Sequence, residues 1–184
     1  GTVRYTLLLS EILTMKIIKN KSIVEDDWSV LRLNAQQLPE NTQVPEGRVI
    51  VPLQVWLKQR QALLERAEIG VWFASDERPE LLKGDIERFS VIAIDFPKFS
   101  DGRGYSIAYN LRVRLGYTKE LRAIGDVLRD QLFYMQRVGF DAFEPRSDRN
   151  IEDALKGLTD FSEVYQKSVD QPLPLFRRVE RSIT

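Results

Sequence analysis

The sequence contains no histidine and no cysteine among its 184 residues. These two absences exclude Ser-His-Asp and Cys-His nucleophile systems, zinc sites built from Cys and His, thiolate-held iron–sulfur clusters, His-ligated haem and disulfide bonds. Any chemistry must therefore use carboxylates, Arg, Lys, Tyr, hydroxyl groups and backbone amides. We accordingly expect no Cys/His metal site.

The sequence also lacks an excess of charge of either sign, because 27 Lys and Arg residues balance 27 Asp and Glu residues. A nucleic-acid-binding protein should show a basic excess or a basic stripe, so we expect no nucleic-acid partner. No apolar run approaches the roughly 18 residues needed to span a bilayer, so we expect no membrane partner and a cytoplasmic location. The hydrophobic fraction of 43% is sufficient for a core. The length predicts one domain.

The two ends of the chain differ from its middle. Residues 1–14 contain a short apolar patch without a cleavage site, unlike a signal peptide, and Met15 follows them. We interpret residues 1–14 as extraneous to the native protein; the alternative is that residues 5–13 form an amphipathic surface helix. Residues 171–184 carry two prolines and several arginines, and are predicted to form an extended tail that docks on this molecule or on a partner. A single domain is thus predicted over residues 15–170.

Short β-branched runs alternate with segments of helical period from residue 48 onward. Strands are predicted at residues 48–52, 70–74, 90–95, 121–124 and 139–143. Helices are predicted at residues 53–64, 79–82, 105–115 and 127–138, and after an N-cap at Asn150. This alternation predicts an α/β fold with a mainly parallel sheet of about five strands and helices on both faces. The size fits a flavodoxin-like or half-barrel-like arrangement, since a complete eight-unit barrel needs roughly 250 residues.

The segment before residue 48 has a different pattern. Two apolar pairs, Ile17–Ile18 and Ile23–Val24, flank a short polar turn and predict a hairpin or edge strands. Residues 34–47 contain two prolines and a glycine and are predicted to form a loop.

The turn after the third predicted strand has the composition of an anion-binding site. In an open α/β sheet, ligands bind beyond the carboxyl ends of the strands. Gly102 and Gly104 allow close backbone approach, the helix that follows presents free amides, and Arg103 adds positive charge. The alternative, given equal weight, is a tight strand-to-helix turn capped by Asp101. The spacing matches neither a dinucleotide fingerprint nor a P-loop, so neither NAD nor flavin is indicated and the cofactor stays unknown.

Candidate catalytic groups follow three of the predicted strands. Asp95, Asp126 and Glu144 come at or after the ends of the third, fourth and fifth strands. If these strands are neighbours, the three carboxylates converge on one rim with nearby arginines, which could bind a phosphate, sulfate or carboxylate while a carboxylate transfers protons. The alternative is a salt-bridge lattice between helix starts, and it is favoured for Asp126 and Asp130.

Two further arginines belong to this interpretation. Arg129, in the first turn of the helix after the fourth strand, is a further anion-binding candidate that would meet Arg103 on the same rim. Arg112 lies one helical turn past Ala108 and is predicted to reach inward, where it would need a carboxylate such as Asp95.

The segment from Asp95 to Phe143 resembles the signature of a bacterial family known as domain of unknown function 934. It contains Asp-Gly-Arg-Gly, Glu-Leu-Arg-Ala, Gly-Asp-Val-Leu and Gly-Phe-Asp-Ala-Phe in that order. The similarity extends from about Met15 to Arg178. Family members are commonly labelled oxidoreductases, and their genes tend to lie beside those of assimilatory sulfite reductase. The resemblance implies a place in sulfur assimilation without implying a mechanism.

The family's motifs also mark candidate functional positions in this chain. These positions are Asp95, Phe96, Asp101, Gly102, Arg103, Gly104, Ser106, Arg112, Glu120, Arg122, Gly125, Asp126, Asp130 and Gln131. Ser106 joins the anion-binding group, and the positions outside that group and the catalytic candidates are given supporting roles. Several relatives have Cys where this chain has Val138, so a thiol is not essential at that position.

Two functional hypotheses follow. The first is an accessory protein of sulfur assimilation that acts with a protein of the sulfite-reductase system and binds a small oxyanion at Gly102–Gly104. The second is an enzyme or sensor for a phosphate- or sulfate-bearing small molecule, including a flavin- or nucleotide-dependent oxidoreductase. Whether the protein is catalytic is left open.

Overall fold

A computed structural model describes residues 15–98, 102–127, 129–146, 148 and 150–165. The predicted extraneous segment, residues 1–14, and the predicted tail, residues 171–184, lie outside these residues. The described part forms one α/β unit around a single sheet.

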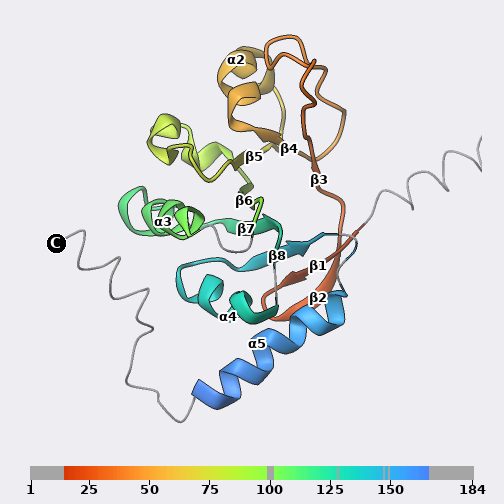
Figure 1. The fold of residues 1–184 in the computed structure, drawn as a ribbon. Coiled ribbons are helices and arrows are strands. Elements are labelled where there is room, and N and C mark those ends of the chain that lie inside the picture. Colours follow the sequence, from red (N-terminus) through yellow and green to blue (C-terminus); the bar gives the residue numbers. More distant parts are fainter. Residues whose placement is uncertain (1–14, 99–101, 128, 147, 149, 166–184) are drawn as a thin grey trace, which may run out of the picture.

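The sheet has eight strands in the order β2-β1-β8-β7-β6-β5-β4-β3 (Figure 1). The strands are β1 Met15–Lys19, β2 Ser22–Asp26, β3 Ser29–Val30, β4 Val49–Pro52, β5 Gly70–Phe73, β6 Val91–Phe96, β7 Glu120–Gly125 and β8 Ala142–Pro145. Strands β3 to β8 run parallel to one another, whereas β1 pairs antiparallel with both β8 and β2. The sheet is therefore mixed.

Helices and turns connect the parallel strands, and a last helix follows β8. In chain order they are α2 Leu53–Leu63, the 3₁₀ turns η1 Pro79–Leu82 and η2 Ile86–Arg88, α3 Arg103–Tyr109, the π-helical turn η3 Asn110–Arg114, α4 Arg129–Arg137 and α5 Ile151–Tyr165. The N-cap predicted at Asn150 is confirmed, because its side-chain oxygen accepts a hydrogen bond from the amide of Asp153 at 2.8 Å.

Residues 34–47, predicted to form a loop, connect β3 to β4 without a helix. The side-chain amide of Gln59, on α2, donates to the carbonyl oxygens of Pro39 and Thr42, each at 2.7 Å. Val44 packs against the main core, and its carbonyl accepts from Arg66 at 3.0 Å. The loop is thus fastened to the outer layer of the molecule.

The helices of the described residues all lie on one face of the sheet. Strands β3 to β8 stand side by side in sequence order, and successive right-handed crossovers then return to the same face. The main core joins helix residues to the outward-facing strand residues, while a second cluster on the inner face contains strand residues and Trp28 but no helix residue among those described. Figure 1 shows α2 to α5 arranged along the outside of the curved sheet.

This arrangement confirms an α/β fold and corrects its details. The half-barrel-like alternative agrees with the curled sheet, whereas about five strands, helices on both faces and a flavodoxin-like order are wrong. The physical reason lies in the curl. The inner face is buried by the sheet's own curvature, so the strands are apolar on both faces, as they would be between two helix layers.

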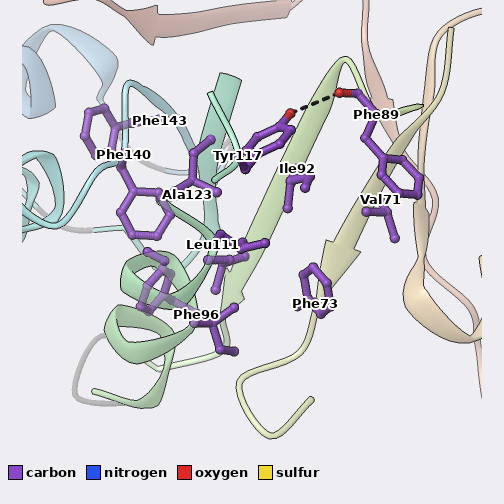
Figure 2. Close-up of a cluster of buried hydrophobic side chains, with 14 of the residues drawn as sticks. Val71, Phe73, Phe89, Ile92, Phe96, Leu111, Tyr117, Ala123, Phe140 and Phe143 are labelled. Atoms are coloured by element: carbon purple, nitrogen blue, oxygen red, sulfur yellow. Dashed lines mark hydrogen bonds between the residues drawn. The ribbon is translucent and has the colours of Figure 1, made fainter. Parts of the chain in front are cut away.

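The main core is rich in aromatic side chains. Trp56 and Phe89 meet edge to face with ring centroids 4.7 Å apart. The hydroxyl of Tyr117 donates to the carbonyl oxygens of Phe89 at 3.2 Å and Glu120 at 3.0 Å, and burial raises the pKa of this phenol (Figure 2). Phe140, placed in a strand by the sequence pattern, instead folds into this core before β8 begins at Ala142.

The N-terminal hairpin closes the sheet. A two-residue turn at Asn20 and Lys21, with φ of 51° and 66°, joins β1 to β2 and confirms the predicted hairpin. Only Asp27 and Trp28 separate β2 from β3, although these are the two edge strands. Three peptide steps span at most about 11 Å, so the two edges of the sheet meet at this corner. The curled sheet therefore encloses its inner face.

Candidate functional site: a pocket at the carboxyl ends of three strands

A pocket of about 550 Å³ lies at the carboxyl ends of β6, β7 and β8. The described residues that line it are Met15, Arg32, Asp95, Phe96, Pro97, Gly125, Asp126, Glu144, Pro145, Arg146 and Asp148. We call it the carboxyl-edge pocket. It occupies the end of the sheet where parallel α/β proteins bind ligands.

Asp95 enters the pocket because of strand alternation along β6. Val91 and Ala93 face the inner cluster, so Asp95, two residues further on, points to the same side. Its carboxylate accepts a hydrogen bond from Arg32, which lies just beyond β3, at 3.0 Å. The guanidinium of Arg32 also lies over the Trp72 ring, 5.1 Å from its centroid. The curl of the sheet thus brings its far edge to β6.

Asp126 reaches the pocket through a sharp turn at the end of β7. Gly125 has a φ of +91°, and a Cβ there would lie 2.5 Å from the Asp95 carboxylate and 2.6 Å from the Phe96 carbonyl oxygen. The amide of Asp126 donates to that same Phe96 oxygen at 2.6 Å. A side chain at position 125 would therefore displace both acidic residues.

Glu144 lies within β8, opposite Ile124 of β7, and faces the inner side of the sheet. The sequence pattern placed this residue in a loop. Burial raises the pKa of the Glu144 carboxyl above its ordinary value of 4.5, and the nearby Arg122 guanidinium opposes that shift. Glu144 is thus a carboxyl group whose protonated form is favoured by its surroundings.

A fully buried arginine stands behind the pocket. Arg122 donates to both carboxylate oxygens of Asp26 at 2.9 and 3.0 Å, to Glu120 at 2.8 Å and to Glu144 at 3.0 Å. Lys19 pairs with the other oxygen of Glu120 at 2.8 Å. Burial lowers the pKa of Arg122, but its hydrogen bond to Asp26 and the three negative charges outweigh that effect, so the guanidinium stays charged. This Arg122 network joins β2, β7 and β8.

Side chains of both charges line the pocket. Its described lining residues include four carboxylates and two guanidinium groups. Arg146 pairs with Asp148 at 3.2 Å, and Arg32 pairs with Asp95. Both lining guanidinium groups are thus already bound to carboxylates of the same pocket.

The structure brings together part of the predicted rim. The three catalytic candidates, Asp95, Asp126 and Glu144, line one pocket. The arginines predicted beside them are not among its described lining residues, since Arg103 donates to the Ser75 hydroxyl at 3.1 Å and Arg129 pairs with Asp153 on α5 at 3.2 Å. The catalytic and anion-binding roles of these residues stay predictions.

The turn at Gly102–Gly104 serves helix packing. A Cβ at Gly104 would lie 2.5 Å from the Phe96 ring, so the glycine allows α3 to lie directly on β6. Gly102 has an ordinary φ of −78° and open space around it. Asp101 lies outside the described residues. Ser106 is exposed on α3.

The residues given supporting roles are dispersed. Arg112 does meet a carboxylate, but that carboxylate is Asp141 at 3.7 Å and not Asp95. Its guanidinium also donates to the carbonyl oxygens of Gly139, Tyr117 and Lys119, at the opposite end of the strands. The helical period correctly predicted that Arg112 points inward, but it could not predict which end of the strands the side chain would reach. Asp130 is exposed on α4 and Gln131 is half-buried, while Glu120, Arg122 and Gly125 belong to the network and pocket described above.

Sequence reasoning missed Asp26 and Arg32. These two residues flank the corner where the two sheet edges meet, and no motif marks that corner in the sequence. Arg146 follows β8 directly, in the loop that the sequence pattern places after the fifth strand, but the pattern gave it no role.

The described residues contain no cluster of three or more acidic side chains arranged to hold a metal ion. Within the same part of the chain, every helix falls short of the length and apolar character that a bilayer crossing requires.

The fold and the pocket define an α/β protein with a curled mixed sheet and a pocket at the carboxyl ends of its strands. The profile of the family described as bacterial protein of unknown function (DUF934) matches residues 70–176, and the chain belongs to this family. Comparison with curated proteins and with solved structures gives no match.

Proposed function

We propose that this protein binds a small molecule in the carboxyl-edge pocket and acts on it with Glu144 as the proton-transferring group. One observation carries the proposal: acidic side chains from the ends of three adjacent parallel strands converge on one pocket of about 550 Å³. Pockets of roughly 300 to 1,000 Å³ are typical of small-molecule sites.

The carboxylates of the pocket have different surroundings. Burial raises the pKa of Glu144, and a raised pKa is the direction that suits a carboxyl group for proton transfer. Arg122 holds one of its oxygens at 3.0 Å and fixes its position. Asp95 instead pairs with the half-exposed Arg32. Carboxyl groups with such different surroundings are the usual arrangement for an acid and a base that share one site.

A ligand screen tests the proposal. Thermal unfolding would be followed with a panel of amino acids, amines, sugars, nucleotides, flavins, sulfate, sulfite and phosphate. A compound that uses the pocket should raise the unfolding temperature of the wild type and of Asp130→Asn, an exposed control on α4, but not that of Asp126→Asn. Turnover of that compound should be lost in Glu144→Gln. Equal stabilisation of both aspartate variants, or no stabilisation by any compound, would contradict the proposal.

A second candidate function comes from membership of the family rather than from the pocket. It is the accessory role in sulfur assimilation implied by the resemblance, with a small oxyanion bound at Gly102–Gly104. The exposed position of Arg103 at the start of α3 favours it. Sulfate or sulfite should then stabilise the wild type and Arg114→Ala but not Arg103→Ala, and sulfite reductase should co-purify with the protein. Retrieval from native lysate that never recovers a sulfur-assimilation enzyme would count against this role.

A further inference from the structure

We propose that Asp26 is a positioning residue for Glu144, acting from outside the pocket through the Arg122 guanidinium that the two carboxylates share. This inference rests on the proposed function, because it names a residue that regulates the proton-transferring group. Asp26 ends β2 and is not among the described residues that line the carboxyl-edge pocket. It would therefore influence the site without touching a ligand.

One nitrogen atom of Arg122 joins the two carboxylates. Its Nη1 donates to Oδ2 of Asp26 at 2.9 Å and to Oε1 of Glu144 at 3.0 Å. The two oxygens are thus at most about 6 Å apart, a separation at which like charges influence each other's ionisation. Arg122 is fully buried, and the side chains of Asp26 and Glu144 are only 12% and 13% exposed. The two carboxylates therefore compete for one cation with little screening by water.

Asp26 holds the guanidinium more firmly than Glu144 does. It accepts through both oxygens, since Nη2 of Arg122 also donates to its Oδ1 at 3.0 Å, whereas Glu144 accepts through one. A two-bond contact of this kind fixes the orientation of the guanidinium plane. Glu120, the third carboxylate on Arg122, is also offset by Lys19 at 2.8 Å, while within the described part of the chain Asp26 pairs with no other cation. The position of Nη1 beside Glu144 consequently depends on Asp26.

The groups around Glu144 act on its proton in opposite directions. Burial raises the pKa of Glu144 most, the Arg122 guanidinium lowers it, the charge of Asp26 raises it again and Arg32 lowers it. The other charged side chains of the described pocket lining are Asp95, Asp126, Arg146 and Asp148. Removal of the Asp26 charge takes away a negative neighbour and leaves Arg122 to the remaining carboxylates. Both effects favour the ionised form of Glu144.

NMR titration of the carboxyl carbons in ¹³C-labelled protein tests the inference. Asp26→Asn keeps the size of the side chain and removes its charge. The acid dissociation constant of Glu144, whose signal is assigned with Glu144→Gln, should rise by about threefold or more in Asp26→Asn. Asp27→Asn is the matched control, because Asp27 is the next residue and pairs on the surface with Arg48 at 3.0 Å. It should leave the constant unchanged.

The wild type offers a second measurement, which decides the question if Asp26→Asn does not fold. The carboxyl carbon of Asp26 should change its chemical shift at the pH at which Glu144 titrates, because both groups bind one nitrogen atom. The carbon of Asp27 should not respond at that pH. The response of Asp26 should be absent from Glu144→Gln.

The outcomes separate this inference from the proposed function. An unchanged or lowered dissociation constant in folded Asp26→Asn, or an Asp26 carbon that ignores the Glu144 titration, would overturn the inference and leave the pocket as the site. Coupled titration together with no ligand in the whole panel would instead overturn the proposed function and, with it, the positioning role. With a ligand that is turned over, the limb of the pH–rate profile that belongs to Glu144 should move to lower pH in Asp26→Asn.

Discussion

At the scale of single residues, Arg122 dominates the inner side of the sheet. Its side chain is fully buried and contacts carboxylates on β2, β7 and β8. Removing one member of a buried ion network leaves its partners as uncompensated charges, which costs more than the network itself contributes. Arg122 therefore fixes the positions of the carboxylates by supplying their counter-charge. Its contact with the described pocket lining is the ion pair with Glu144.

Replacement of Arg122 by methionine should lower the free energy of unfolding by about 3–5 kcal/mol. Urea denaturation would measure the loss, and Arg114→Met, on the exposed side of η3, should change stability by less than about 0.5 kcal/mol. Adding Glu144→Gln to Arg122→Met should recover part of the loss, because it removes one uncompensated carboxylate. A loss below about 1 kcal/mol in the single variant would show that the network is not a stabilising feature.

The raised pKa of Glu144 predicts a pH dependence of stability. Between 4.5, its ordinary value, and its pKa in the folded protein, the folded state binds more protons than the unfolded state. The free energy of unfolding should therefore fall as pH rises through this window. Burial raises the pKa of Asp141 as well, so that residue contributes a fall of the same sign.

The difference in stability between wild type and Glu144→Gln isolates the glutamate. Urea denaturation at several pH values should show that the wild-type advantage shrinks, or its disadvantage grows, as pH rises. A difference that stays constant from pH 4 to pH 8 would mean that the folded protein does not shift this pKa.

At the scale of elements, α3 packs directly on β6 beside the pocket. The Phe96 ring lies where a Cβ of residue 104 would be, so the strand that carries Asp95 is fixed against a helix that has a glycine at this position. The same glycine belongs to the motif that suggested an anion site. Its packing role and an anion-binding role predict different effects of substitution.

Gly104→Ala should lower the free energy of unfolding by about 1–3 kcal/mol, because its methyl group would overlap the Phe96 ring. Gly102→Ala is the matched control: its φ of −78° suits any residue and no atom lies within 4 Å of the added carbon. It should be neutral or should stabilise by up to about 1 kcal/mol. Chemical denaturation would measure the free energy of unfolding of both variants. Equal losses of stability at the two positions would contradict the packing explanation.

The elements were largely predictable from the sequence, and their arrangement was not. Hydrophobic period located α2, α4 and β6 to within a few residues, because local burial sets that period. Strand order could not be predicted in this way, because a strand buried by the curvature of the sheet and a strand buried between two helix layers have the same apolar composition. Asp95 and Asp126 were found because they follow strands, whereas Asp26 and Arg32 depend on contacts across the curled sheet.

At the scale of the whole molecule, the connection through Asp27 and Trp28 joins the two edges of the sheet. The Trp28 amide donates to the Asp26 carboxylate at 3.1 Å, and that carboxylate also holds Arg122. The short connection thus sets the curvature of the sheet and the position of one network partner. The pocket depends on both.

Insertion of Gly-Ser-Gly between Asp27 and Trp28 should lower the free energy of unfolding by at least about 1 kcal/mol, the value of the hydrogen bond it breaks. The same insertion between Gln37 and Leu38, two exposed residues of the 34–47 loop, interrupts neither the 34–37 nor the 38–42 turn and should add only loop entropy of about 0.6 kcal/mol per doubling of length. Thermal and urea unfolding would measure both. A smaller effect at the corner than in the loop would show that the corner does not hold the edges together.

The pairing of β1 with β8 also constrains how the chain can fold during synthesis. Ile18 pairs with Phe143, so β1 cannot pair with β8 until about 120 further residues have been translated. At about 5–20 residues per second, translation of that stretch takes roughly 6–25 seconds. During this time the hairpin exposes an unpaired strand edge, which is a site for pairing with other chains. Completion of the carboxyl-edge pocket is consequently a late event, because β8 supplies both Glu144 and the partner of that edge.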